Sequence, residues 1–280
     1  MTGPISEAFA RAKRERRLAF IPYVMAGDPN LATTEAVVGA LGAAGADLIE
    51  LGIPYSDPLA DGPTIAAAGA RALENQTRPA DVIGYVRRRA GDCAPLLLFT
   101  YYNPVYQFGI ERFADAAALA GAAGAIVPDL ALEESGSLRD ALHARGLEMP
   151  LLVAPSTPRE RAKRIAEAAS GFVYVVSRLG VTGAGKTPDF TPLRAQLSML
   201  REATRKPLAV GFGLSRADEI LAIRELADGV IVGSALIDSF TGKSGTAAAR
   251  AAAQFVAPLI GACRDASAPS YPSGNASPSD

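Results

Sequence analysis

Short, continuous apolar runs alternate with longer alanine-rich stretches along almost the whole chain. Continuous apolar runs, unlike runs in which apolar and polar residues alternate, are typical of parallel strands that helices cover on both faces. They predict strands at Ala19–Met25, Leu48–Gly52, Leu96–Tyr101, Ala125–Val127, Leu151–Ala154, Phe172–Val176, Leu208–Gly211 and Gly229–Val232.

The stretches between these runs have the apolar spacing of helices. Several begin with residues that favour a helix start, such as Thr33 shortly before Glu35 and Pro79 shortly before Asp81. The predicted helices are Thr33–Ala44, Pro79–Ala90, Glu111–Ala123, Glu133–Arg145, Pro158–Ala169, Pro192–Thr204, Arg216–Leu226 and Thr246–Cys263.

Eight strand–helix units in a chain of 280 residues predict a (β/α)8 barrel, the TIM barrel, as a single α/β domain over residues 1–265. A doubly wound open sheet is the alternative that this pattern leaves open. Residues 266–280 contain many Pro, Ser and Gly residues and no apolar period, so they cannot bury enough surface to offset their chain entropy. We expect them to form a disordered tail.

Bulk composition narrows the classes of function. A net charge of −1 gives no indication of nucleic acid or an anionic membrane as a partner. No apolar run approaches the roughly 20 residues that span a bilayer, and the polar N-terminus lacks the apolar core of a secretory signal. The two cysteines, Cys93 and Cys263, lie far apart, which favours a reducing, cytoplasmic location.

The single histidine, His143, excludes several kinds of chemistry. It falls in a helical pattern, and we expect it to be an ordinary helix residue. With one histidine and two distant cysteines, we expect no metal site and no histidine-based nucleophile triad. The remaining candidates for chemistry are carboxylates, hydroxyls and backbone amides.

Three carboxylates follow one another around the second predicted strand. Glu50 lies within the apolar strand, and Asp57 and Asp61 lie on the loop that follows it. Alternation along a strand puts Leu48, Glu50 and Gly52 on one face, which we predict to be the inner face of the barrel. A buried carboxylate is costly unless it is paired or used, and two carboxyls in different environments can take different acid–base roles.

Structural explanations compete with these functional ones. Glu50 could be neutralised by a neighbouring arginine or by hydroxyl groups. Asp61 precedes a helix start at Pro63 and could be an N-cap, and Asp57 before Pro58 is more simply a turn residue.

Glycine-rich segments follow the seventh and eighth predicted strands, at Gly211–Ser215 and Gly233–Ile237. Glycines let backbone amides approach a ligand closely, and Ser234 can begin a short helix. Barrels commonly hold a phosphate after strands seven and eight. The alternative is that these glycines only terminate strands.

The segment Gly180–Thr187 matches the P-loop pattern, but a P-loop continues directly into a helix at its Lys-Thr. Here Pro188 follows at once and prevents that helix start. We therefore reject nucleotide binding and expect the segment to be a mobile lid over the barrel mouth.

Five segments together resemble the tryptophan synthase alpha subunit family. The resemblance runs from about Phe20 to Ile260, and the run from Glu50 to Pro63 is highly specific for the family. It implies a barrel enzyme that cleaves indole-3-glycerol phosphate to indole and D-glyceraldehyde 3-phosphate in tryptophan biosynthesis, a retro-aldol reaction. The segments are Ile21–Pro29, Glu50–Thr64, Pro128–Leu130, Ser177–Gly183 and Gly211–Ser215.

The resemblance also implies residue roles. Glu50 would be the acid–base group, and Asp61 a fixed anion near the ring nitrogen. Tyr174 would lie beside the substrate, and Thr182 would contact Asp61 when the lid closes. The family's indole pocket matches Tyr23, Ile65 and Phe212, and its phosphate-binding backbone matches Gly183, Gly213, Gly233 and Ser234.

Family members bind a beta subunit that contains pyridoxal phosphate, and indole passes between the two active sites. The resemblance therefore implies an alpha2-beta2 heterotetramer and no cofactor in this chain. Ala131 departs from the family's usual proline in a loop that faces the beta subunit, and the lid residues Ala184–Lys186 are also less typical. Two other functions remain open: a different phosphate-sugar barrel enzyme, such as an epimerase or isomerase, and a non-catalytic regulatory subunit, against which Glu50 and Asp61 argue.

Overall fold

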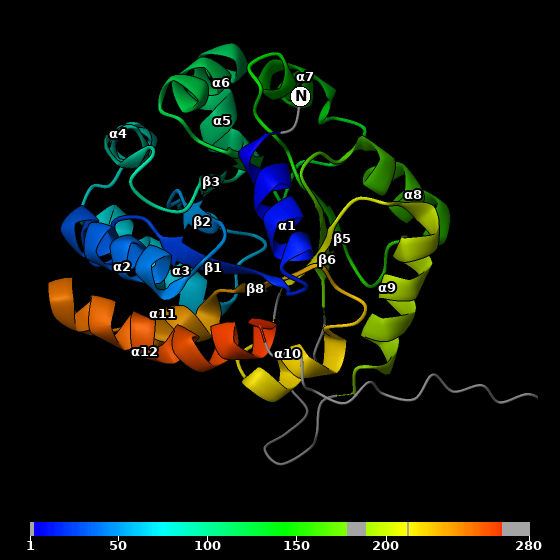
Figure 1. The fold of residues 1–280 in the computed structure, drawn as a ribbon. Coiled ribbons are helices and arrows are strands. Elements are labelled where there is room, and N and C mark those ends of the chain that lie inside the picture. Colours follow the sequence, from blue (N-terminus) through cyan, green and yellow to red (C-terminus); the bar gives the residue numbers. More distant parts are fainter. Residues whose placement is uncertain (1–2, 178–188, 212, 265–280) are drawn as a thin grey trace, which may run out of the picture.

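The computed structural model describes residues 3–177, 189–211 and 213–264 of the chain. Within them, eight parallel strands form one sheet in the order β4-β3-β2-β1-β8-β7-β6-β5, with helices packed around it (Figure 1). The strands are β1 Ala19–Met25, β2 Ile49–Gly52, β3 Leu96–Phe99, β4 Gly124–Ile126, β5 Leu151–Val153, β6 Val173–Val176, β7 Leu208–Gly211 and β8 Gly229–Val232.

The two end strands of this order, β4 and β5, are joined through a residue just before β5. Gly124 forms a parallel bridge with Glu148, the Ala125 amide donates to the Glu148 carbonyl at 3.1 Å, and the Glu148 amide donates to the Ala123 carbonyl at 3.3 Å. The ring of strands is thereby closed, which confirms the TIM barrel and excludes the open sheet.

All eight predicted helices are present, with shifted ends. The second helix begins at Leu31 because the Asn30 side chain, not Thr33, caps it: Asn30 Oδ1 accepts from the Thr33 amide at 2.9 Å. The helices of the described residues are α1 Pro4–Arg14, α2 Leu31–Ala44, α3 Pro63–Glu74, α4 Pro79–Arg89, α5 Tyr102–Phe108, α6 Ile110–Leu119, α7 Gly136–His143, α8 Arg159–Ala168, α9 Thr191–Ala203, α10 Ala217–Ile223, α11 Ser234–Phe240 and α12 Gly245–Arg264.

The helices α1 and α5 were not predicted, and of α3 and α11 only the starts, near Pro63 and Ser234, were indicated. In the first 17 residues, charges of both signs outnumber the few apolar residues of a narrow stripe, so the helical pattern is weak. Helix α5 is too short to show a helical period of apolar residues. His143 is the exposed last residue of α7, as expected for an ordinary helix residue. The predicted lid at Gly180–Thr187 and the predicted tail at 266–280 lie outside the described residues.

Helix α1 covers the N-terminal end of the barrel. Its first turn is held by the buried Glu148 side chain, which accepts hydrogen bonds from the Ile5 amide at 2.8 Å, the Ser6 amide at 3.2 Å and the Ser6 hydroxyl. Phe9 packs against Phe172 beneath β6, with ring centroids 5.3 Å apart. Glu148 therefore both closes the ring and anchors the helix that seals it.

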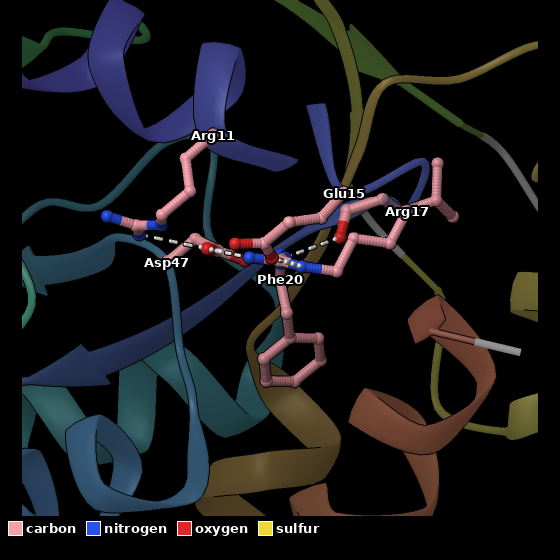
Figure 2. Close-up of polar contacts among 6 residues, drawn as sticks. Arg11, Glu15, Arg17, Phe20 and Asp47 are labelled. Atoms are coloured by element: carbon pink, nitrogen blue, oxygen red, sulfur yellow. Dashed lines mark hydrogen bonds and ion pairs between the residues drawn. The ribbon is translucent and has the colours of Figure 1, made fainter. Parts of the chain in front are cut away.

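A second buried carboxylate ties β1 to β2 at the same end (Figure 2). Asp47 accepts from Arg17 at 2.5 and 2.8 Å, from Arg11 at 3.0 Å and from the Phe20 amide at 3.0 Å. Burial alone would raise the pKa of Asp47, but these hydrogen bonds outweigh burial and lower it. The carboxylates at this end are thus fully paired.

No helix in the described part of the chain is long and apolar enough to cross a membrane.

Barrel closure is testable at Gly124. A Cβ atom there would lie 1.9 Å from the Glu148 carbonyl oxygen, so alanine would push the two backbones apart. We expect Gly124→Ala to lower the free energy of unfolding by about 2–4 kcal/mol, measured by urea denaturation.

The matched control is Gly39→Ala in α2, where a new Cβ would meet no atom within 4 Å. We expect that change to be neutral or to stabilise the protein by up to about 1 kcal/mol. Equal effects of the two substitutions would contradict the closure at Gly124.

Candidate active site

A cavity of about 300 Å³ opens at the C-terminal ends of the strands. It brings together every predicted site residue that the structure describes: Tyr23, Glu50, Asp61, Ile65, Tyr174, Gly213, Gly233 and Ser234. Three further predicted residues, Thr182, Gly183 and Phe212, lie outside the described residues.

Glu50 projects into this cavity from β2. Its Cα pairs with Tyr23 on β1 and with Leu97 on β3, so these three side chains share the inward level of the barrel. The residue is 1% exposed, and its Oε1 atom is buried without a hydrogen-bond partner among the described residues. The competing structural explanation, neutralisation by an arginine or by hydroxyls, therefore has no support in the described part of the chain.

The burial of Glu50 changes its acid–base behaviour. Removal from water disfavours the charged form and raises the pKa from 4.5 to about 8. The Glu50 carboxyl is therefore mostly protonated at neutral pH, and both of its protonation states are populated at pH values close to neutral.

Two tyrosines complete the wall around Glu50, and each depends on a glycine for its space. A Cβ at Gly52 would lie 2.2 Å from the Tyr23 hydroxyl oxygen, and one at Gly211 would lie 2.4 Å from that of Tyr174. Burial raises the pKa of Tyr23 and of Tyr174 well above the usual value, and the neighbouring carboxyls add to this effect. Both phenols therefore stay neutral.

Asp61 faces the cavity from the loop after β2 and is half-buried. The N-cap of α3 is Gly62, without a side-chain cap, so the structure does not support Asp61 as the helix cap. Burial raises the pKa of Asp61, and a hydrogen bond with Tyr101 partly opposes that rise. The Tyr101 hydroxyl also accepts from the Ala60 amide at 3.0 Å, which fixes the loop.

Asp57 remains outside the cavity. It is exposed and accepts a 2.5 Å hydrogen bond from the neighbouring Ser56 hydroxyl, as expected for a turn residue. The two loop carboxylates therefore differ in position, and only Asp61 is available to a molecule in the cavity.

The opposite wall consists of the turns after β7 and β8. Gly213 has φ +89°, a conformation that favours glycine, and Glu219 holds the turn by accepting from the Ser215 amide at 2.7 Å and the Arg216 amide at 3.0 Å. A Cβ at Gly233 would make only ordinary contacts, the nearest at 3.5 Å, so packing does not require glycine there. The turn leads into α11, which begins at Ser234.

Sequence reasoning missed several residues of the site. The apolar run of the third strand predicts Tyr101 only as the end of that strand. Asp238, on α11, accepts from the Thr64 hydroxyl at 3.3 Å, which links α11 to α3. No local pattern distinguishes these residues, because their neighbours come from distant parts of the chain. The other lining residues not predicted are Phe99, Leu214, Ser215, Ile231 and Ala235.

The closed barrel and its cavity define a (β/α)8-barrel enzyme with two carboxyl groups in different environments. The chain belongs to the tryptophan synthase alpha chain family, as the resemblance implied: the family model for "Tryptophan synthase alpha chain" matches residues 9–263. Members of this family are carbon–carbon lyases acting on indole-3-glycerol phosphate.

Individual relatives agree. The chain is 49% identical to the tryptophan synthase alpha chain of Gloeobacter violaceus, over 84% of this chain and 86% of that one. It is 44% identical to that of Arabidopsis thaliana, over 83% and 85%. A tryptophan synthase structure from Mycobacterium tuberculosis superposes with a TM-score of 0.86 at 33% identity and covers 94% of this chain and 99% of that one.

The raised pKa of Glu50 predicts a pH-dependent stability cost. The folded protein keeps the Glu50 proton up to about pH 8, whereas the unfolded chain releases it near 4.5, so Glu50 reduces stability as the pH rises between these values. Glutamine does not titrate. We therefore compare the free energy of unfolding of Glu50→Gln with that of the wild type. We expect the difference, variant minus wild type, to increase by about 2–4 kcal/mol from pH 5 to pH 8.

Urea unfolding at the two pH values measures this difference. The control is Glu160→Gln on the exposed surface of α8, for which we expect no such growth. A constant difference for Glu50→Gln would mean that Glu50 titrates like an exposed carboxyl.

Proposed function

We propose that this chain cleaves indole-3-glycerol phosphate to indole and D-glyceraldehyde 3-phosphate, with Glu50 as the acid–base group and Asp61 as the fixed anion. The observation that carries the proposal is the buried Glu50 carboxyl, which has no partner among the described residues and faces a cavity that Asp61 also lines. Such a carboxyl holds its proton at neutral pH and can donate it to carbon.

The first step is proton donation. Protonated Glu50 gives its proton to the indole ring carbon that bears the glycerol chain, and the positive charge that results is delocalised toward the ring nitrogen. In this scheme the ionised form of the half-buried Asp61 stabilises this charge, which exists only during the reaction. The Tyr101 hydroxyl orients the Asp61 carboxylate.

The second step breaks the carbon–carbon bond. The Glu50 carboxylate takes the proton of the glycerol hydroxyl next to that bond. The oxygen lone pair then forms the aldehyde carbonyl, and the electrons of the broken bond return to the ring and restore aromatic indole. Glu50 ends protonated, as it began, so the cycle needs no external acid or base.

Binding is divided between two sides of the cavity. Tyr23, Ile65 and Tyr174 provide an apolar wall for the indole ring, together with Phe212. The backbone amides of Gly213, Gly233 and Ser234 hold the phosphate, together with Gly183, and Thr182 contacts Asp61 when the substrate is enclosed. The roles of Thr182, Gly183 and Phe212 rest on the family resemblance alone.

The proposal includes a beta subunit as partner, in an alpha2-beta2 assembly, with pyridoxal phosphate held by that partner. Large apolar side chains exposed on the segments that follow β2 and β3 support docking there: Leu59 is 89% exposed and Tyr106, on α5, is 63% exposed. Ala131 is also exposed, in place of the family's usual proline. The free cysteines Cys93 and Cys263 agree with a cytoplasmic location, which we include in the proposal.

Removing either carboxyl should impair turnover. We expect Glu50→Gln to lower the rate of indole release at least about 1,000-fold, because no group remains to move the proton, while substrate still binds. We expect Asp61→Asn to lower it about 100-fold, because a neutral amide cannot stabilise the cationic ring. The control is Asp57→Asn, assayed without a beta subunit, for which a rate near that of wild type is expected. Wild-type turnover by Glu50→Gln would refute the assigned role.

The pH profile tests the starting protonation state. Glu50 must begin protonated, so kcat/KM for indole release should fall as the pH rises through about 8. Asp61 must be ionised, so kcat/KM should also fall in acid, below the raised pKa of Asp61. A rate that keeps rising through pH 8 and 9 would mean that the reaction starts from ionised Glu50.

Indole release by the purified chain, alone and with a beta subunit, tests the proposal as a whole. An epimerase or isomerase would turn over a pentose phosphate instead, and a regulatory subunit would turn over neither substrate.

A further inference from the structure

A second cavity, of about 410 Å³, lies at the opposite end of the barrel from Glu50. One side of it is α1, and the others are the segments that lead into β1, β7 and β8, represented by Leu18, Pro207 and Asp228. These residues precede their strands, whereas the substrate cavity lies where the strands end. A molecule in this second cavity would therefore leave the path to Glu50 open.

The second cavity is strongly basic. One acidic side chain, Asp228, is found among the described residues that line it. The chain as a whole has a net charge of −1, so general basicity does not explain the concentration of positive charge. The basic lining residues are Lys13, Arg16, Arg17, Arg201, Arg205 and Arg224.

Two of these cations are already paired within the protein. Arg17 binds Asp47 and Glu15 (Figure 2), and Arg201 binds Asp228 at 2.5 Å. These pairs hold the wall of the cavity in place. Their carboxylates neutralise most of the positive charge of Arg17 and Arg201, so these two side chains contribute little to binding an anion.

The side chains of the other four cations, Lys13, Arg16, Arg205 and Arg224, have no hydrogen bond or ion pair with any described residue. The Nη1 atom of Arg224 is buried without an acceptor. Arg16 has φ +54°, a conformation uncommon for residues other than glycine, at the turn that follows α1. Unpaired charges of one sign around one hollow repel each other, and an anion between them would relieve that repulsion.

We propose that this second cavity binds a phosphate monoester with a small apolar body. Arginine guanidinium groups pair with phosphate oxygens through two parallel hydrogen bonds, and Lys13 adds a point charge. Phe9, Leu18 and Ala227 form an apolar part of the wall against which the body of the ester would pack. A free phosphate ion would use the cations and leave this apolar wall unused.

Calorimetric titration of the full chain with phenyl phosphate and with inorganic phosphate tests the proposal. We expect phenyl phosphate to occupy two sites on the wild type, one in each cavity. The double variant Lys13→Gln/Arg205→Gln removes two exposed, unpaired cations and should fold normally. We expect it to lose one site, or to bind there at least tenfold more weakly, while it releases indole at the wild-type rate.

The matched control is Lys163→Gln/Arg250→Gln, which removes two exposed cations elsewhere, and it should keep both sites. Equal binding by both double variants, equal losses in both, or a wild type whose binding sites all persist in Lys13→Gln/Arg205→Gln would overturn the proposal. Inorganic phosphate bound as tightly as phenyl phosphate would overturn the assignment to an ester. If the proposed function fails and phenyl phosphate does not bind in the substrate cavity, the wild type keeps one site, which only Lys13→Gln/Arg205→Gln removes. Failure of the proposed function is therefore distinguishable from failure of this proposal.

Discussion

Closure of the strand ring between β4 and β5 is the constraint on which the rest of the structure depends. The bridge from Gly124 to Glu148 turns a sheet of eight parallel strands into a barrel whose inward side chains face only one another. Glu50 is one of them, level with Tyr23 and Leu97. Because this carboxyl is 1% exposed and has no cation partner among the described residues, burial raises its pKa and keeps its proton in place.

Buried carboxyl groups have different environments at the two ends of the barrel. At the N-terminal end, Asp47 and Glu148 are buried but fully hydrogen-bonded, and they fasten β1, β2 and α1 together. At the C-terminal end, Glu50 is buried without a partner among the described residues, and the half-buried Asp61 has a hydrogen bond with Tyr101. Stability is thus concentrated at one end and reactivity at the other, as in other barrels of this kind.

The sequence predicted what local patterns can show. Continuous apolar runs marked all eight strands within a few residues, and a lone glutamate in such a run, Glu50, indicated the inner face of the barrel. Contacts between distant segments could not be predicted: the closure through Glu148, the Tyr101 hydroxyl on Asp61 and the basic cavity each join residues far apart in the chain. The roles of Thr182, Gly183 and Phe212 remain predictions.

The central claim is that a closed barrel holds Glu50 protonated at neutral pH. Carbon-13 NMR of protein labelled at the glutamate side-chain carboxyls, with the Glu50 signal assigned by its absence in Glu50→Gln, reads that protonation state directly. The account predicts a carboxyl that titrates near pH 8 in the free protein. A Glu50 signal that titrates near pH 4.5 would contradict it.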